Sequence, residues 1–204
     1  MSRSYRDREM LFYYFYSMGR RGRNNLTEER FYFVTTTVVR FTPIFTNYRF
    51  CDILISNIKH YREKYKFIVL GYVIMPSHFH WILIVNPNYG TISDIMRDIK
   101  KFTAWQIFDT LEENENDALL KIFEESANGL KDQTKKLWMP RFDDEVIRNQ
   151  QMFWAKLNYI HNNPIKAGLV SRAEDYKYSS ARNYINRDNS VLEVDVEYAG
   201  IRML

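Results

Sequence analysis

Residues 67–85 read FIVLGYVIMPSHFHWILIV and predict two buried strands joined by a tight turn. The first strand covers 67–75 and the second covers 78–85, because aromatic and β-branched residues dominate both segments. Pro76 and Ser77 lie between them and are typical of a turn. The two strands are therefore expected to form a hairpin, around which the other elements pack.

The flanking segments predict one more strand on the amino-terminal side and helices on both sides. By composition and periodicity they are a strand at 31–40, an amphipathic helix at 46–65, a helix from 91 to about 113 capped by Thr91 or Ser93, an irregular connector at 137–144, a helix at 145–163 that stops before Pro164, and a possible strand at 191–196. This order of elements favours an α+β fold, with helices packed on one antiparallel sheet.

Composition excludes several classes of protein. The chain has 204 residues and one cysteine, Cys51, so a disulfide framework and a cysteine-based zinc site are both excluded. The seven glycines are scattered singly and build neither a dinucleotide-binding nor a nucleotide-phosphate loop. No apolar run approaches the ~20 residues that span a bilayer, and no secretory signal is visible at residues 1–9.

The charge is unevenly distributed along the chain. The net charge is +4, but residues 112–125 alone carry −5, so the rest of the chain carries +9. The acidic stretch is expected to be a solvated extension. A basic body in a chain with 16% aromatic residues makes nucleic acid a candidate partner, because phosphates attract Lys and Arg and bases stack on aromatic rings.

His78 and His80 lie two residues apart at the head of the second hairpin strand. Their side chains are predicted to share one face of the sheet, with Cα atoms ~7 Å apart, whereas Phe79 and Trp81 point to the opposite face. Two neutral imidazoles at this spacing could share a metal ion. The alternative is a pair of histidines satisfied by ordinary hydrogen bonds.

The predicted final helix carries three polar side chains on one side. Tyr159 and Asn163 lie at i and i+4, with Lys156 on the same side, while His161 lies roughly 200° around the helix from Tyr159. Asn163 could offer an amide oxygen to a metal, or could be a local helix-end residue before Pro164. Spacing alone does not separate Tyr159 from the other fourteen tyrosines.

Four segments, in order, resemble the HUH family of single-tyrosine transposases, and within it the REP-associated branch. VIMPSHFHWILIV at 73–85 resembles the His-hydrophobe-His signature, and YIHNNPIKAGLV at 159–170 resembles the YIxxNPxxAGL helix. LWMPRFDDEVI at 137–147 resembles the connector before that helix, and YKYSSARNY at 176–184 resembles the YxxSS ending.

This resemblance implies a ferredoxin-like or RRM-like HUH nuclease fold at 30–184, with an acidic insertion near 112–136, a basic extension at 1–29 and a tail at 185–204. It implies Tyr159 as the nucleophile, and His78, His80 and Asn163 as ligands of Mg²⁺ or Mn²⁺. Better-known mobile members have Gln at the position of Asn163.

The implied activity is metal-dependent cleavage and rejoining of single-stranded DNA through a 5′-phosphotyrosine link. The implied substrate is a DNA hairpin, and the implied setting is the bacterial cytoplasm, near the nucleoid. The implied protein acts as a homodimer or as a monomer. Two alternatives stay open: a domesticated hairpin-binding protein with little cleavage, and an HUH-type replication or mobilisation nuclease.

Basic and aromatic residues around the implied site are expected to contact DNA, although each could instead be a solvated charge or a packing group. They are Lys100, Lys101, Trp138, Arg141, Arg148 and Lys156, with a further basic cluster at Arg20, Arg21 and Arg23. Arg141 is the strongest of these candidates, because a cation beside the aromatic Trp138 and Phe142 suits a DNA strand.

Overall fold

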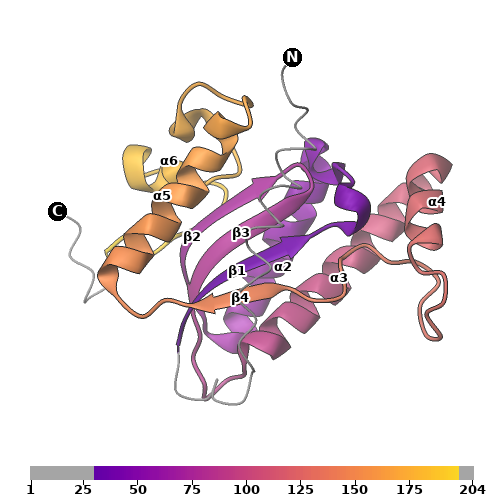
Figure 1. Cartoon of the computed structure of the whole chain (residues 1–204), viewed down its shortest axis with the longest axis horizontal. Helices are drawn as coiled ribbons and strands as arrows, with labels where there is room; N and C mark the ends of the chain where they lie inside the picture. The colour runs from indigo at the N-terminus through magenta and orange to yellow at the C-terminus, as the bar shows by residue number, and fades with distance from the viewer. Residues whose placement is uncertain (1–29, 198–204) are drawn as a thin grey trace.

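A computed structural model describes residues 30–197 of the chain (Figure 1). In chain order its elements are β1 (Phe31–Thr37), the 3-10 turns η1 (Val39–Phe41) and η2 (Ile44–Thr46), α2 (Tyr48–Tyr65), β2 (Ile68–Met75), β3 (His78–Ile84), α3 (Ile92–Glu113), α4 (Asp117–Glu125), β4 (Asp143–Val146), α5 (Gln150–Lys166), η3 (Ala173–Asp175) and α6 (Ala181–Asn186).

The strands form one antiparallel sheet in the order β2-β3-β1-β4. The hairpin predicted from 67–85 is present as β2 and β3, with Met75 opposite His78. β1 pairs with the other edge of β3, so that Thr35 lies opposite His80. The predicted α+β fold with an antiparallel sheet is confirmed.

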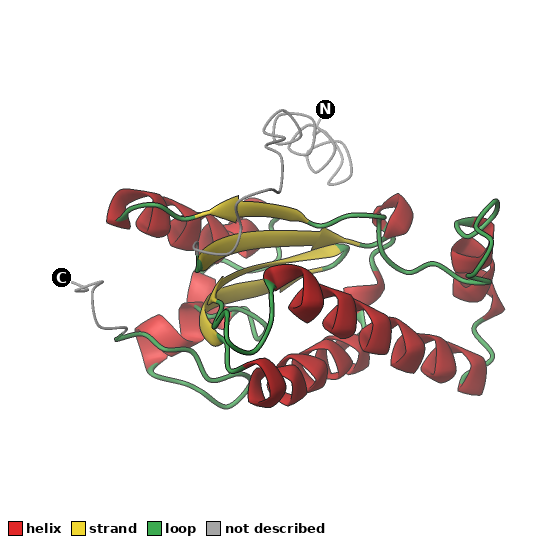
Figure 2. Cartoon of the chain, turned by 90° about the horizontal axis from the view of Figure 1, so that it is seen from below, coloured by secondary structure: helices red, strands yellow, loops and turns green. Residues whose placement is uncertain are grey.

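Helices cover both faces of the sheet (Figure 2). A separate apolar core lies under each face. On one face, α2 and α3 pack against the alternate strand residues that include Phe79 and Trp81. On the other face, α5 packs through Phe153, Leu157 and Ile160. α5 is thereby held against the face that carries His80.

Gly71 lets α5 approach the sheet closely. A Cβ atom at this position would lie 2.7 Å from Leu157 Cδ1. We expect Gly71→Ala to lower the free energy of unfolding by about 1 kcal/mol, because Leu157 or the helix must shift. Urea unfolding measures the change, and Gly71→Ala with Leu157→Val should recover part of it, since valine lacks Cδ atoms. Unchanged stability in Gly71→Ala would contradict the close approach.

The helix predicted at 145–163 is wrong at both ends. Residues 143–146 form β4, which pairs with the free edge of β1. α5 begins only at Gln150, where the Asn149 side chain accepts a hydrogen bond from the Met152 amide. It continues through Pro164 to Lys166, because a proline this near the end removes little of the remaining hydrogen bonding.

Two other expectations need correction. The possible strand at 191–196 is absent, and this segment is joined to β2 by a backbone hydrogen bond from Asp195 to Val69. The acidic stretch 112–125 is more than a solvated extension, because α4 buries Leu120 and Phe123. Its acids pair with basic residues elsewhere, as Glu125 does with Arg40 at 2.9 Å.

Candidate functional site

His78 and His80 project from β3 toward the α5 face of the sheet. Their ring centroids lie 4.7 Å apart with the ring planes at 74°. Phe79 and Trp81, the alternate residues, are buried in the core on the other face. The predicted shared face of the two imidazoles is confirmed.

A strand neighbour fixes the orientation of His80. Thr35 on β1 lies directly opposite, and its Oγ1 is 2.7 Å from His80 Nδ1. Burial lowers the pKa of His80 well below its ordinary value, and the neighbouring His78 lowers it further, so the ring is neutral at pH 7. With Nδ1 bonded to threonine, Nε2 is the nitrogen presented to α5.

Tyr159 on α5 meets that nitrogen. Its hydroxyl oxygen lies 3.3 Å from His80 Nε2, although 79 residues separate the two in sequence. Phe33 on β1 stacks on His80, with centroids 5.6 Å apart and planes at 16°, and meets Tyr159 edge-on at 6.1 Å. One chain therefore brings together the histidine and the tyrosine that the sequence singled out.

Asn163 lies one helical turn beyond Tyr159 on the same side of α5. Its Nδ2 atom is buried and has no hydrogen-bond partner among the described residues. Amide nitrogen and oxygen are assigned by their partners, so the orphaned end of this amide is equally suited to be the oxygen. A buried amide end without a partner, on the side of α5 that carries Tyr159, fits a divalent cation as the missing partner.

The histidine pair lacks a further strong ligand of the usual kinds. Within residues 30–197, no group of three or more His, Cys, Asp and Glu side chains is placed to hold a metal ion. A metal on the two imidazoles would therefore need an amide oxygen such as that of Asn163, with phosphate or water completing its shell.

Two of the predicted DNA-contact residues lie inside the fold. Trp138 is 6% exposed, packs against Phe45 and Phe79, and donates from Nε1 to the Lys100 carbonyl oxygen. Lys100 Nζ donates to the Met139 carbonyl oxygen. Both residues join α3 to the connector, and the Trp138 ring offers no open face to a base, so this expectation is corrected for Trp138.

The remaining basic candidates differ in setting. Lys101, Arg141 and Arg148 are exposed, and the Lys101 ammonium lies 4.7 Å from the centroid of the exposed Trp105 ring. Lys156 lies at the site itself, where its Nζ is 4.7 Å from the centroid of Phe33. Arg20, Arg21 and Arg23 lie outside the described residues.

Sequence reasoning missed three residues that shape the site. Phe33 and Thr35 contact His80 from β1, and Glu145 on β4 forms an ion pair with Lys156 at 2.5 Å. The β-branched run that contains Thr35 signalled a strand, but pattern alone gives no register. The sequence predicts a helix at Glu145, so no sequence pattern indicated that this residue lies beside β1.

The fold and these residues define a class: an α+β protein whose central strand presents a histidine pair to a helix-borne tyrosine. The family model described as "Transposase IS200 like" matches residues 30–163, which is more than half of the chain. The chain belongs to the IS200-like transposase family.

Individual relatives agree with this assignment. The "REP-associated tyrosine transposase" of Escherichia coli (strain K12) is 28% identical over 122 residues, covering 59% of this chain and 58% of that protein. The match thus spans less than two thirds of the relative's length. A solved structure titled "Structure of the REP associates tyrosine transposase bound to a REP hairpin" is similar in fold, with a TM-score of 0.61 and 21% identity over 91% of this chain and 95% of that one.

Membrane-spanning helices are absent from the part of the chain that the structure describes. No helix within 30–197 combines the length and the apolar character that crossing a bilayer requires.

Proposed function

We propose that this chain is a metal-dependent endonuclease and strand transferase acting on single-stranded DNA, with Tyr159 as its nucleophile. The observation that carries the proposal is the 3.3 Å approach of the Tyr159 hydroxyl to His80 Nε2 across the α5–sheet interface. Membership of a transposase family supports DNA cleavage as the activity. The intact histidine pair and tyrosine favour cleavage over hairpin binding alone.

In the proposed reaction, the Tyr159 hydroxyl loses its proton to water and its oxygen attacks a backbone phosphorus, while the departing 3′ oxygen takes up a proton from water. A bond forms between the tyrosine oxygen and phosphorus, and the bond from phosphorus to the 3′ oxygen breaks. The products are a 5′-phosphotyrosine link and a free 3′-hydroxyl, and attack by a 3′-hydroxyl on that link reverses the step. Phe33 keeps the Tyr159 and His80 rings in place, while Thr35 keeps Nε2 pointed at the reacting oxygen.

His78, His80 and Asn163 are the residues that would hold the divalent ion, Mg²⁺ or Mn²⁺. Such an ion, when bound, polarises the scissile phosphate and offsets negative charge that develops on its oxygens. Covalent storage on tyrosine keeps the phosphodiester energy for rejoining, so no nucleotide cofactor is needed.

The proposed substrate is a single-stranded DNA with a hairpin. A REP hairpin is bound by the structural relative, whose fold this chain shares. The exposed Lys101, Arg141 and Arg148, together with Lys156 at the site, supply positive charge for the phosphates.

A single incubation tests the proposal. Wild-type protein, Mn²⁺ and a labelled hairpin oligonucleotide with single-stranded flanks are expected to give a protein–DNA adduct that survives denaturation. An adduct that forms equally well in EDTA would contradict the metal requirement. Absence of any adduct, with hairpin binding intact, would favour the alternative of a hairpin-binding protein.

Thr35→Val should raise the Mn²⁺ concentration needed for half-maximal adduct formation by about 10- to 100-fold. The reason is that loss of the hydroxyl frees the His80 ring to turn. Loss of a hydrogen bond to the second ring nitrogen of a metal-binding histidine typically lowers metal affinity by that factor. The measurement is a Mn²⁺ titration of adduct yield.

Thr36→Val is the matched control, because Thr36 is the next residue of β1 and therefore points to the other face of the sheet. Its buried hydroxyl has no hydrogen-bond partner among the described residues, so this change should leave the titration unmoved. An equal shift in both variants would mean that the Thr35 hydroxyl has no special part in holding His80.

A further inference from the structure

An ion pair at the edge of the site joins Lys156, one of the residues proposed to face DNA phosphates, to the carboxylate of Glu145. Lys156 Nζ lies 2.5 Å from Glu145 Oε2, with the two side chains 14% and 44% exposed. The lysine comes from α5, one helical turn before Tyr159, and the glutamate comes from β4 at the edge of the sheet. Two separate elements thus deliver opposite charges to one point.

The sheet register places this pair on the face that carries the histidines. Glu145 lies directly opposite Phe33, two residues before Thr35 on β1, and Thr35 lies opposite His80. The Lys156 ammonium also sits 4.7 Å from the centroid of the Phe33 ring, whose plane stacks on His80. The Phe33 ring therefore contacts the Lys156 ammonium and also both rings of the His80–Tyr159 contact.

Taking a charged side chain out of water costs free energy unless a counter-ion lies beside it. Burial lowers the pKa of Lys156 to about 8 and raises that of Glu145, because desolvation disfavours the charged form of each group. A carboxylate beside a site for a phosphodiester repels that substrate, and its presence there calls for a reason.

We propose that Lys156 is a phosphate-binding subsite for the DNA backbone beside the nucleophile, and that Glu145 occupies this subsite as a stand-in anion when DNA is absent. The inference rests on the proposed function. A phosphodiester and a carboxylate compete for the same ammonium. Glu145 holds the cation in place, at the cost of some affinity for DNA.

The test is DNA binding by single and double variants, measured in the Tyr159→Phe background so that no covalent step contributes. The probe is a fluorescent single-stranded hairpin oligonucleotide, and anisotropy is followed over a range of KCl. We expect Lys156→Gln to weaken binding about 5- to 10-fold and to reduce the salt slope by about 0.7, the value for one lost phosphate contact. Lys156→Arg should retain most of the affinity.

Glu145→Gln should act in the opposite direction and tighten binding about 3-fold or more, because it removes the competing anion. The penalty of Lys156→Gln should then be larger in the Glu145→Gln protein than in the parent, since the carboxylate no longer competes with DNA for the lysine there. A purely structural ion pair predicts instead that both single changes weaken binding together.

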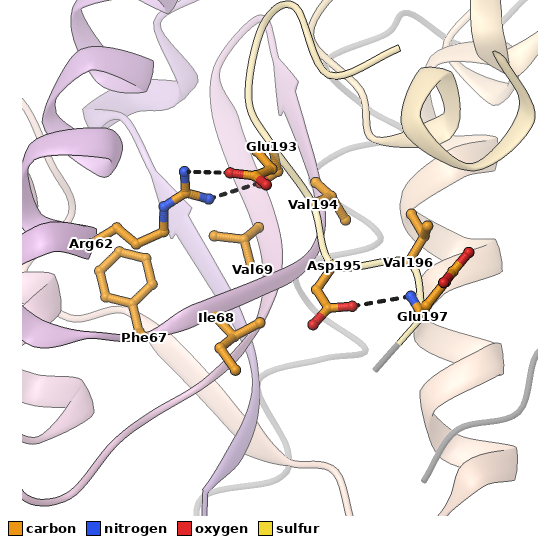
Figure 3. Close-up of a pocket in the computed structure, with 9 residues that line it drawn as sticks. All are labelled: Arg62, Phe67, Ile68, Val69, Glu193, Val194, Asp195, Val196 and Glu197. Carbon is orange, nitrogen blue, oxygen red and sulfur yellow. Dashed lines mark hydrogen bonds and ion pairs between the residues drawn. The ribbon is translucent and has the colours of Figure 1, made fainter. Parts of the chain in front are cut away.

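Glu193→Gln is the matched control for loss of a carboxylate. Glu193 pairs with Arg62 at 3.4 Å in a pocket beside the start of β2, at the far end of that strand from the hairpin turn (Figure 3). This change should alter hairpin affinity less than 2-fold. Equal tightening by Glu193→Gln and Glu145→Gln would reduce the effect to net charge and overturn the proposal.

Failure of the inference differs from failure of the proposed function. If Lys156→Gln and Glu145→Gln shift affinity in the same direction while wild type still forms the adduct, the phosphate subsite is wrong and the nuclease stands. If wild type forms no adduct, the nuclease is wrong whatever the binding series gives. Thermal melting of each variant confirms that the comparison is made on folded protein.

Discussion

Tyr159→Phe will form no covalent adduct with hairpin DNA. Phenylalanine has no oxygen to attack phosphorus, and removal of a catalytic nucleophile typically costs a factor of about 10³ or more. The change deletes one atom from a ring that packs edge-on against Phe33 and His80, so the α5–sheet interface is kept. Labelled DNA that comigrates with the protein under denaturing conditions is the measured quantity.

The control for this experiment is another tyrosine that loses only its hydroxyl. Tyr89, in the loop between β3 and α3, is 52% exposed, and Tyr89→Phe should form the adduct at the wild-type level. Hairpin binding should persist in both variants. An adduct that survives Tyr159→Phe would mean that another residue attacks the phosphate, and the proposed nucleophile would be wrong.

The parts of the fold with a strong local signal could be predicted from the sequence. The hairpin at 67–85 and the helix from 91 have dense apolar patterns with distinct periods, a turn signal and a capping residue. Thr91 does cap α3, in a reciprocal capping box with Asp94. Alternation along β3 was sufficient to place His78 and His80 on one face and Phe79 on the other.

β4 could not be predicted, because its stability is non-local. The segment DDEV at 143–146 is acidic and has little intrinsic tendency to form a strand. It is a strand because the edge of β1 has unpaired backbone groups that residues 143–146 can satisfy. Reading Glu145 as helical followed directly from the helical spacing of the residues after it.

The site shows the same division between local and tertiary information. Helical spacing put Tyr159 and Asn163 on one side of α5, but no pattern within that helix says which strand it packs on. The contact of Tyr159 with His80 depends on Gly71 and on the apolar residues of α5, and the hydrogen bond between Thr35 and His80 depends on the β1–β3 register. Only the resemblance to a known family assigned Tyr159 and the two histidines to one site, which the physical patterns alone had left open.

His80→Ala will abolish DNA cleavage and leave part of the hairpin binding. The imidazole is the group that Thr35 orients and that the Tyr159 hydroxyl meets, so its loss removes both a proposed metal ligand and the partner of the nucleophile. Phosphate contacts by basic residues elsewhere do not depend on it. We expect cleavage to fall by at least about 10³-fold and affinity to fall by less than about 10-fold.

His80 is 3% exposed, so alanine leaves a cavity that could unsettle the sheet, and a second variant guards against this. His78 is only half-buried, and His78→Ala should also abolish cleavage with little loss of stability. His60→Ala, on the exposed side of α2, is the matched control and should cut DNA normally. Chelation with EDTA should reproduce the loss in the wild type, and excess Mn²⁺ should restore it. Cleavage that persists in folded His78→Ala and in EDTA would rule out the metal and leave Tyr159 to act without it.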